Sequence, residues 1–314
     1  MYRLQVYDDQ TLGLHWHIHK HGAKHYSAAQ RKGDIVEVAI AIGADPASVY
    51  SATAPLPPQI DEILFAGWLR KSKVPMVKAK TIDLEVPAEA EFVLEGYANA
   101  GELRREGPFG DHTGYYSLPD DYPVFHLKAI TRRRNPIYLT TIVGKPPMED
   151  YYIGKATERL FLPLLRLVLP EVVDMNMPME GVFHNLLIVS IDKSYPGQPQ
   201  KVMNGIWGLM LMMLTKTIIV VDADVDVHNV SDVIWRVTNN VDPKRDFLIS
   251  EGPLDALDHS SPVPHFGSKL GIDATRKSPA DGHNRPWPGD VVMSDDVKKR
   301  VDEKLKRLGI PGLG

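Results

Sequence analysis

The sequence predicts a mixed protein, α+β in its first half and α/β in its second. β-Branched stretches separated by turns run through the first 150 residues, which is typical of antiparallel strands with short helices between them. After that point apolar strands alternate with helical patterns, which favours an α/β layer. A diproline within residues 145–150 separates the two patterns, so we expect a domain boundary there.

The expected elements of the first half follow from local patterns. Four stretches have the composition of strands, namely residues 34–42, 92–96, 124–130 and 137–143. A short helix is expected over 45–50, because Asp45 can cap it and a proline follows in the first turn. A second helix is expected over Pro58–Arg70, where apolar residues recur at helical spacing.

The second half is expected to alternate helices and strands. Helices are predicted over 149–168, 200–213 and 232–238, with strands over 186–191 and 217–222 between them. The chain becomes loop-like after residue 273, and a charged helix follows over 294–308 with a serine start. The predicted domains are therefore residues 1–147, residues 148–290 and a tail helix within 291–314.

Composition excludes several classes of protein. The 314 residues are 43% hydrophobic and 24% charged, as in ordinary globular proteins, and the formal net charge of −4 argues against nucleic acid as a partner. The absence of cysteine excludes disulfides, thiolate metal sites and cysteine nucleophiles. We find neither a signal peptide nor an apolar run of about 18 residues, so we expect a cytoplasmic protein without an integral membrane segment.

The densest chemical signal is the stretch EGPFGDHTGYY at residues 106–116. Glu106 and Asp111 bracket a turn in which Gly107 and Gly110 permit backbone conformations that other residues avoid. Such a turn can aim both carboxylates into one cavity, where their pKa values are pushed apart and one carboxylate can serve as an acid. An ordinary turn with solvated acids explains the pattern about equally well.

A second signal is a run of alternating histidines, His15, His17, His19 and His21. On a strand these side chains would share one face, with Trp16 and Lys20 opposite. Imidazoles at this spacing can bind a metal, and a basic and aromatic strand can hold a phosphate and a flat ring. A surface strand with one or two functional members is the alternative. Arg3 and Glu62, taken alone, indicate only solvated side chains.

Seven blocks together make the chain resemble the UbiD decarboxylases over about residues 1–275. In chain order they are FAGWLR, EGPFGDHTGYY, GKPP, VDADVDV, VIWRV, VDPKRD and GSKLGIDATRK. The members it resembles most decarboxylate 3-polyprenyl-4-hydroxybenzoate in quinone biosynthesis or act in the menaquinone pathway. The resemblance implies a split-barrel flavin-binding domain, followed by an α/β domain through which copies form a homo-oligomer.

The resemblance also implies the cofactors and the reaction. Family members hold prenylated FMN, made by a flavin prenyltransferase, and clamp its phosphate with Mn²⁺ and K⁺. The substrate is an aromatic or α,β-unsaturated carboxylic acid, which bonds to the extra ring of the cofactor, loses CO2 and receives a proton.

The family's functional residues fall on identifiable positions of this chain. Arg3, Glu106 and Asp111 would be catalytic, with Arg3 pairing with the substrate carboxylate and Asp111 donating the proton. Glu62 and His19 would bind the metal, although a small shift in alignment would choose His21 instead of His19. The cofactor-binding residues would be Met1, Tyr2, Arg3, His15, Trp16, His17, Lys20 and His21, with Lys216 as a weaker contact.

One departure from the family leaves the function open. Family members carry a segment before the block that contains Arg3, and it holds an asparagine metal ligand and part of the barrel. We therefore expect either that an N-terminal complementing polypeptide supplies this segment or that the chain is a fragment or split gene product. The chain could be the catalytic part of a decarboxylase or a non-catalytic flavin-binding or assembly subunit of a split one. A cofactor-independent, metal-dependent hydrolase that uses the histidines leaves the last two blocks unexplained.

Overall fold

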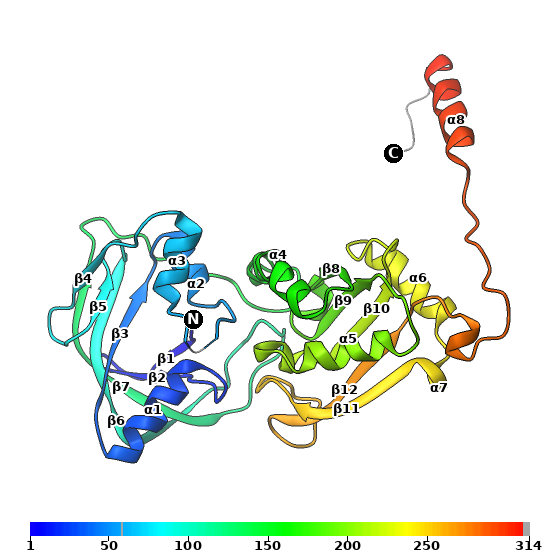
Figure 1. Cartoon of the computed structure of the whole chain (residues 1–314). Helices are drawn as coiled ribbons and strands as arrows, with labels where there is room; N and C mark the ends of the chain where they lie inside the picture. Colours follow the sequence, from blue (N-terminus) through cyan, green and yellow to red (C-terminus); the bar gives the residue numbers. More distant parts are fainter. Residues whose placement is uncertain (58, 310–314) are drawn as a thin grey trace. The chain divides into compact units, whose positions relative to one another are not determined.

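The computed structural model describes residues 1–57 and 59–309, which form two compact units that meet between Thr275 and Arg276 in the sequence. The first unit contains two five-stranded sheets with their helices, and the described part of the second contains the short 3₁₀ helix η3 (Pro279–Asp281) and helix α8 (Asp295–Arg307) (Figure 1). Helix α8 confirms the charged terminal helix, and the last five residues of the predicted tail lie outside the described residues. The described chain contains no helix that is long and apolar enough to cross a membrane.

The first sheet is antiparallel throughout, with the order β1-β2-β7-β6-β3. Its strands are β1 (Leu4–Val6), β2 (Thr11–Leu14), β3 (Val36–Ile42), β6 (Phe92–Glu106) and β7 (Asp120–Arg132). The long pair β6 and β7 confirms two of the predicted strands and extends both of them. Because Glu106 closes β6 and pairs with Asp120 at the start of β7, the motif at 106–116 forms the loop of this hairpin.

Three helices and a small two-stranded sheet accompany the first sheet. They are α1 (His21–Lys32), α2 (Pro46–Ser51), α3 (Glu62–Arg70), β4 (Met76–Lys78) and β5 (Glu85–Pro87). Asp45 caps α2, as predicted, by accepting hydrogen bonds from the backbone of the first turn. Helix α3 begins later than predicted because Asp61 caps it in the same way, and Pro58 lies outside the described residues.

The second sheet has the order β11-β12-β10-β9-β8, with parallel pairing among β9, β10 and β12. Its strands are β8 (Val172–Asn176), β9 (Leu186–Ile191), β10 (Thr217–Asp222), β11 (Phe247–Pro253) and β12 (Phe266–Asp273). The associated helices are α4 (Asp150–Val168), α5 (Gln198–Trp207), α6 (Val230–Asn240) and α7 (Pro243–Asp246), with 3₁₀ turns η1 (Met179–Gly181) and η2 (Met210–Leu214). Successive residues of β9 belong to two different apolar clusters, so both faces of the strand are buried. This sheet confirms the predicted α/β layer.

Three local predictions were wrong. Residues 137–143 were predicted as a strand but pair with no strand of the described chain. The backbone N–H of Ile137 donates instead to the Glu91 carboxylate. The helix predicted over 200–213 ends at Trp207, where Gly208 separates it from a 3₁₀ turn. The alternating histidines share no strand face, because β2 ends at Leu14 and α1 begins at His21.

Candidate active site

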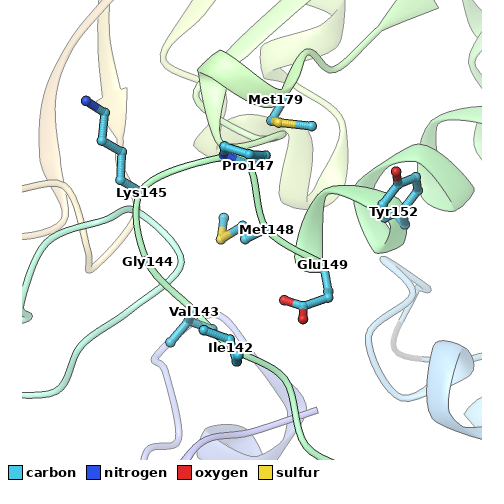
Figure 2. A pocket seen from close by; sticks show the side chains of 9 residues that line it. All are labelled: Ile142, Val143, Gly144, Lys145, Pro147, Met148, Glu149, Tyr152 and Met179. Atoms are coloured by element: carbon cyan, nitrogen blue, oxygen red, sulfur yellow. The ribbon is translucent and has the colours of Figure 1, made fainter.

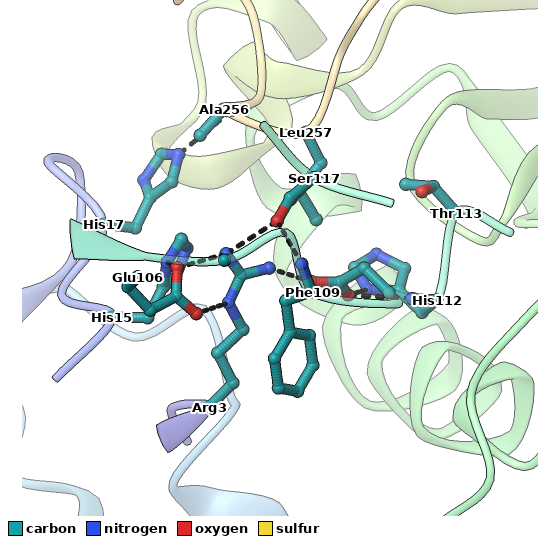
Figure 3. Close-up of polar contacts among 12 residues, drawn as sticks. Arg3, His15, His17, Glu106, Phe109, His112, Thr113, Ser117, Ala256 and Leu257 are labelled. Atoms are coloured by element: carbon teal, nitrogen blue, oxygen red, sulfur yellow. Dashed lines mark hydrogen bonds and ion pairs between the residues drawn. The ribbon is translucent and has the colours of Figure 1, made fainter. Parts of the chain in front are cut away.

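Arg3 lies at the centre of an ion-pair network at the base of the β6–β7 hairpin loop (Figure 3). Its Nε and Nη2 atoms donate to the two carboxylate oxygens of Glu106, each at 2.9 Å. Its Nη1 atom donates to Oδ2 of Asp111 at 2.5 Å, and Nη2 also reaches Oγ of Ser117 at 3.0 Å. The fold thus brings together the three residues that the sequence predicted to be catalytic.

The loop conformation explains how these side chains meet. Ser117 N–H donates to the Phe109 carbonyl at 2.8 Å, so the loop folds back on itself with Asp111 near its tip. The left-handed glycines are Gly107, with φ of 91°, and Gly114, with φ of 83°. Gly110 was expected from the sequence to adopt such a conformation as well, but it has no positive φ and instead forms a β-bridge across the loop.

The two carboxylates occupy different environments. Glu106 is fully buried and bonded through both oxygens to the guanidinium, the strong bidentate arrangement. Asp111 keeps 13% of its side-chain exposure and shares one oxygen with Arg3 and the other with His112. Burial raises the pKa of Asp111, but hydrogen bonds from His112 and Arg3 outweigh it and hold that pKa well below its usual range. Asp111 is therefore ionised in this arrangement.

Two aromatic side chains border the network. Burial and the nearby Arg3 charge lower the pKa of His15 to about 3, so this ring is neutral. Its Nδ1 atom lies 3.6 Å from Glu106 and has no hydrogen-bond partner within the described residues. Tyr122 packs on His15 with ring centroids 4.3 Å apart, and burial raises the pKa of its hydroxyl to about 12. Both rings present uncharged surfaces beside the carboxylates.

A cavity of about 350 Å³ is lined in part by the two residues that precede Arg3. It contains four of the predicted cofactor-binding residues: Met1, Tyr2, Lys20 and His21. Further polar groups on its wall are His19, Lys24 and Glu62, and its apolar wall comes from Trp207, Met210, Leu211, Met213 and Pro253. The volume is in the range of sites for small molecules, and the lining combines cationic and apolar groups.

Within this cavity the structure pairs Glu62 with His21 rather than with His19. Oε1 of Glu62 lies 3.1 Å from Nδ1 of His21. The His19 ring instead lies near His17 and His265, at centroid distances of 5.3 and 6.5 Å, and its Nε2 atom has no hydrogen-bond partner among the described residues. Residues 1–57 and 59–309 contain no group of three or more histidine, aspartate or glutamate side chains arranged to hold a metal ion.

The remaining predicted cofactor residues do not line the cavity. Trp16 packs against the apolar cluster of the first sheet, with its ring 5.8 Å from that of Tyr26. His17 accepts a hydrogen bond from the backbone of Ala256 at 3.1 Å. Lys216 pairs with Asp258 at 2.7 Å and contacts Ser260.

The structure adds one contact that the sequence did not indicate. His112 lies 2.7 Å from Asp111 through Nδ1 and 2.8 Å from Nε2 of His184 through Nε2. Phe183 stacks on the His112 ring with centroids 5.2 Å apart. His112 belongs to the conspicuous motif, but His184 is a lone histidine 72 residues further on, and no local pattern marks it.

A second cavity, of about 490 Å³, lies next to the same loop (Figure 2). Gly114 of the loop approaches Lys145 so closely that a Cβ on the glycine would lie 2.9 Å from the lysine Cα. The lining is mainly apolar, and its two charged side chains are Lys145 and Glu149. The other lining residues are Ile142, Val143, Gly144, Pro147, Met148, Tyr152 and Met179. The segment wrongly predicted as a strand thus supplies part of a cavity wall.

Two family models match successive parts of the chain. Residues 1–146 match the family model of the 3-octaprenyl-4-hydroxybenzoate carboxy-lyase Rift-related domain, and residues 151–274 match that of its C-terminal domain. An uncharacterized protein of Archaeoglobus fulgidus is 56% identical over 96% of the chain, and one of Aquifex aeolicus is 54% identical over 99%. The chain spans 63% and 64% of the length of these relatives.

Solved structures show the same fold. The closed form of vanillic acid decarboxylase from Sedimentibacter hydroxybenzoicus has a TM-score of 0.88 and 31% identity, over 98% of this chain and 65% of that one. The UbiD-class enzyme HmfF from Pelotomaculum thermopropionicum, solved in complex with FMN, has a TM-score of 0.80 and 29% identity, over 95% of this chain and 65% of that one. An evolved dimeric form of HmfF, solved with prenylated FMN, has a TM-score of 0.77 and 28% identity, over 95% and 64% of the two chains.

Proposed function

The chain belongs to the UbiD carboxy-lyase family, and from that premise we propose that it carries out the non-oxidative decarboxylation of an aromatic or α,β-unsaturated carboxylic acid with prenylated FMN. The observation that carries this proposal is the network in which Arg3 holds Glu106 and Asp111 together. A guanidinium that binds two carboxylates can exchange the more exposed one for the carboxylate of a substrate, and the carboxyl displaced from it is suited to move a proton.

The cavity of about 350 Å³ fits a phosphorylated flavin. Lys20 and Lys24 can offset phosphate charge, and no side chain caps the N-terminus of α1 at Lys20. The apolar wall around Trp207 and Met210 can cover a flat ring. Prenylated FMN, when bound, supplies the electron sink that accepts the charge left on carbon as CO2 departs.

Glu62 and His21 are the residues that we propose to hold a divalent cation such as Mn²⁺. Carboxylate and imidazole ligands suit such an ion, and oxygens of the phosphate and of water would complete its shell. The ion would offset the phosphate charge beside the lysines. His19, predicted from the sequence, lines the same cavity and remains the alternative ligand.

Arg3 would bind the substrate carboxylate while Glu106 keeps the guanidinium in place. Once the substrate takes the contact that Asp111 makes with Arg3, the pKa of Asp111 rises, because a cation that stabilised its ionised form is lost. Asp111 can then carry a proton and deliver it to the carbon that has lost CO2. The reaction R–COO⁻ + H⁺ → R–H + CO2 consumes one proton in each turnover.

The cavity of about 490 Å³ beside the loop would receive the apolar body of the substrate. Its mainly apolar lining favours a 4-hydroxybenzoate-type acid, with or without a polyprenyl chain, as in quinone biosynthesis. We further propose that a flavin prenyltransferase supplies the cofactor, that copies of the chain form a homo-oligomer and that the protein acts in the cytoplasm.

The test is reconstitution with prenylated FMN and Mn²⁺, with and without K⁺, followed by measurement of CO2 release from a panel of 4-hydroxybenzoate-type and α,β-unsaturated acids. We expect release that depends on the cofactor and is lost in Arg3→Ala. Flavin binding without CO2 release from any of these acids, also after addition of an N-terminal complementing polypeptide, would contradict the catalytic proposal and favour a flavin-binding or assembly subunit.

A further inference from the structure

We propose that His112 and His184 form a proton relay that reprotonates Asp111 after each turnover. The inference rests on the proposed decarboxylation, because only a reaction that consumes a proton needs such a supply. Its structural basis is a continuous chain of short contacts. Oδ1 of Asp111 lies 2.7 Å from Nδ1 of His112, and Nε2 of His112 lies 2.8 Å from Nε2 of His184.

The chemistry of these groups assigns the protons. An ionised carboxylate can only accept, so Nδ1 of His112 carries the proton that it donates to Asp111. In the form of His112 whose only proton is on Nδ1, Nε2 is bare, and the hydrogen at the second contact then comes from Nε2 of His184. In that form both rings direct their N–H groups toward Asp111, which is the direction in which the relay moves a proton.

No other titratable side chain is hydrogen-bonded to Asp111 within the described residues. Its Oδ2 atom is bound by Arg3, which does not release its proton in proteins. Its Oδ1 atom accepts only from the backbone and ring of His112. Asp150 acts on His112 by charge but has no hydrogen bond to Asp111. A proton that reaches Asp111 through the protein must therefore pass through His112.

The surroundings keep the relay aligned and favour the neutral form of His184. Phe183 stacks on the His112 ring, with an interplanar angle of 19°, and fixes its orientation. Burial lowers the pKa of His184 to about 4, while the buried Asp255 opposes this shift and favours a transient charge on the ring. Nδ1 of His184 is buried and has no hydrogen-bond partner in residues 1–57 and 59–309, so it is free to accept an incoming proton.

One cycle balances in protons. Asp111 gives its proton to the carbon and becomes ionised. A proton from solvent has to reach the buried Nδ1 of His184; the Nε2 proton of His184 then passes to Nε2 of His112, and the Nδ1 proton of His112 passes to Asp111. Rotation of the rings together with proton exchange restores the starting tautomers. His112 and His184 are thus positioning and relay residues, and Asp111 alone contacts the reacting carbon.

The first test needs neither cofactor nor substrate. In the unloaded chain with ¹⁵N-labelled histidine, NMR should show His112 as the Nδ1–H tautomer and His184 as the Nε2–H tautomer near pH 7. His184→Gln should perturb the His112 signals, whereas His25→Gln, on the exposed face of α1, should not. A bare Nδ1 on His112 would overturn the relay even if decarboxylation were demonstrated.

The second test separates bond cleavage from proton delivery. In His184→Gln the amide can still donate to His112 but cannot transfer protons, so we expect kcat to fall at least about tenfold. The first burst of CO2 should remain while hydrogen incorporation into the product slows, and in His184→Gly added imidazole should restore turnover. Unchanged kcat, or loss of the burst itself, would overturn the relay. Absence of any CO2 release from the parent would refute the proposed function instead, and the NMR result would stand by itself.

Discussion

Replacing Asp111 by asparagine is expected to stop turnover while leaving the flavin bound. An amide of the same shape can keep the backbone hydrogen bond from His112, but it cannot deliver a proton to carbon. Loss of an acid–base group typically lowers the rate by about 10²–10⁴-fold. Asp111 does not line the cavity assigned to the flavin, so flavin occupancy should not change.

The same substitution has a predictable cost in stability. Arg3 keeps both of its hydrogen bonds to Glu106, so its charge remains paired when Asp111 becomes neutral. The loss is therefore close to that of one hydrogen bond between charged groups, about 1.5–3 kcal/mol of unfolding free energy at pH 7. Because the native pKa of Asp111 is lowered, its contribution is present above the unfolded value of 3.8 and fades as the pH falls below it.

Three measurements test these expectations. Urea unfolding at pH 7 and near pH 3 gives the unfolding free energy, CO2 release gives kcat, and absorbance gives the flavin content. The matched control is Asp121→Asn, which removes an exposed carboxylate that pairs with Arg105 at 3.3 Å in the same hairpin. We expect the control to change stability by less than about 1 kcal/mol. A kcat for Asp111→Asn within about tenfold of the parent would refute its role as the acid.

Three other predictions follow from the same geometry. Glu62→Gln should lower manganese content and flavin occupancy together, whereas Glu89→Gln, an exposed carboxylate, should change neither, as metal analysis and absorbance would show. Gly114→Ala should lower the unfolding free energy by at least about 1 kcal/mol, because φ is 83° and its Cβ would lie 2.9 Å from Lys145; an unchanged urea midpoint would contradict this. Burial lowers the pKa of His184 to about 4, so the unfolded chain binds a proton at this ring more readily than the folded chain does, and the unfolding free energy should decrease as the pH falls from 6.5 toward 4. In His184→Gln the melting temperature should therefore depend less on pH over that range.

The sequence predicted the fold best where local signals and burial agree. Asp45 caps a helix as expected, and the apolar runs at 186–191 and 217–222 became the buried parallel strands β9 and β10. Residues 137–143 have an equally strong β-branched composition but found no partner strand. Strand formation requires a neighbour to satisfy backbone groups, and composition does not show whether one is present.

The site was predictable only in part for a similar reason. The spacing within one motif suggested that Glu106 and Asp111 would converge, whereas the place of Arg3 beside them came from the family resemblance. The alternating histidines suggested a shared face, but α1 begins at His21 and turns that ring toward Glu62. His184 meets His112 only through the packing of the second half of unit 1 against the hairpin loop. Such long-range contacts leave no local pattern in a single sequence.

Glu106 and Asp111 differ in burial and in the number of hydrogen bonds that they accept from Arg3, and this difference decides which of them a substrate carboxylate can displace. Glu106 is fully buried and holds the guanidinium through two hydrogen bonds, so releasing it would leave a buried charge unpaired at a cost of about 3–5 kcal/mol. Asp111 gives up one contact, retains His112 on its other oxygen and keeps some exposure to solvent. An incoming carboxylate should therefore displace Asp111 from Arg3. Because the same displacement raises the pKa of Asp111, substrate binding would itself prepare the acid that completes the reaction.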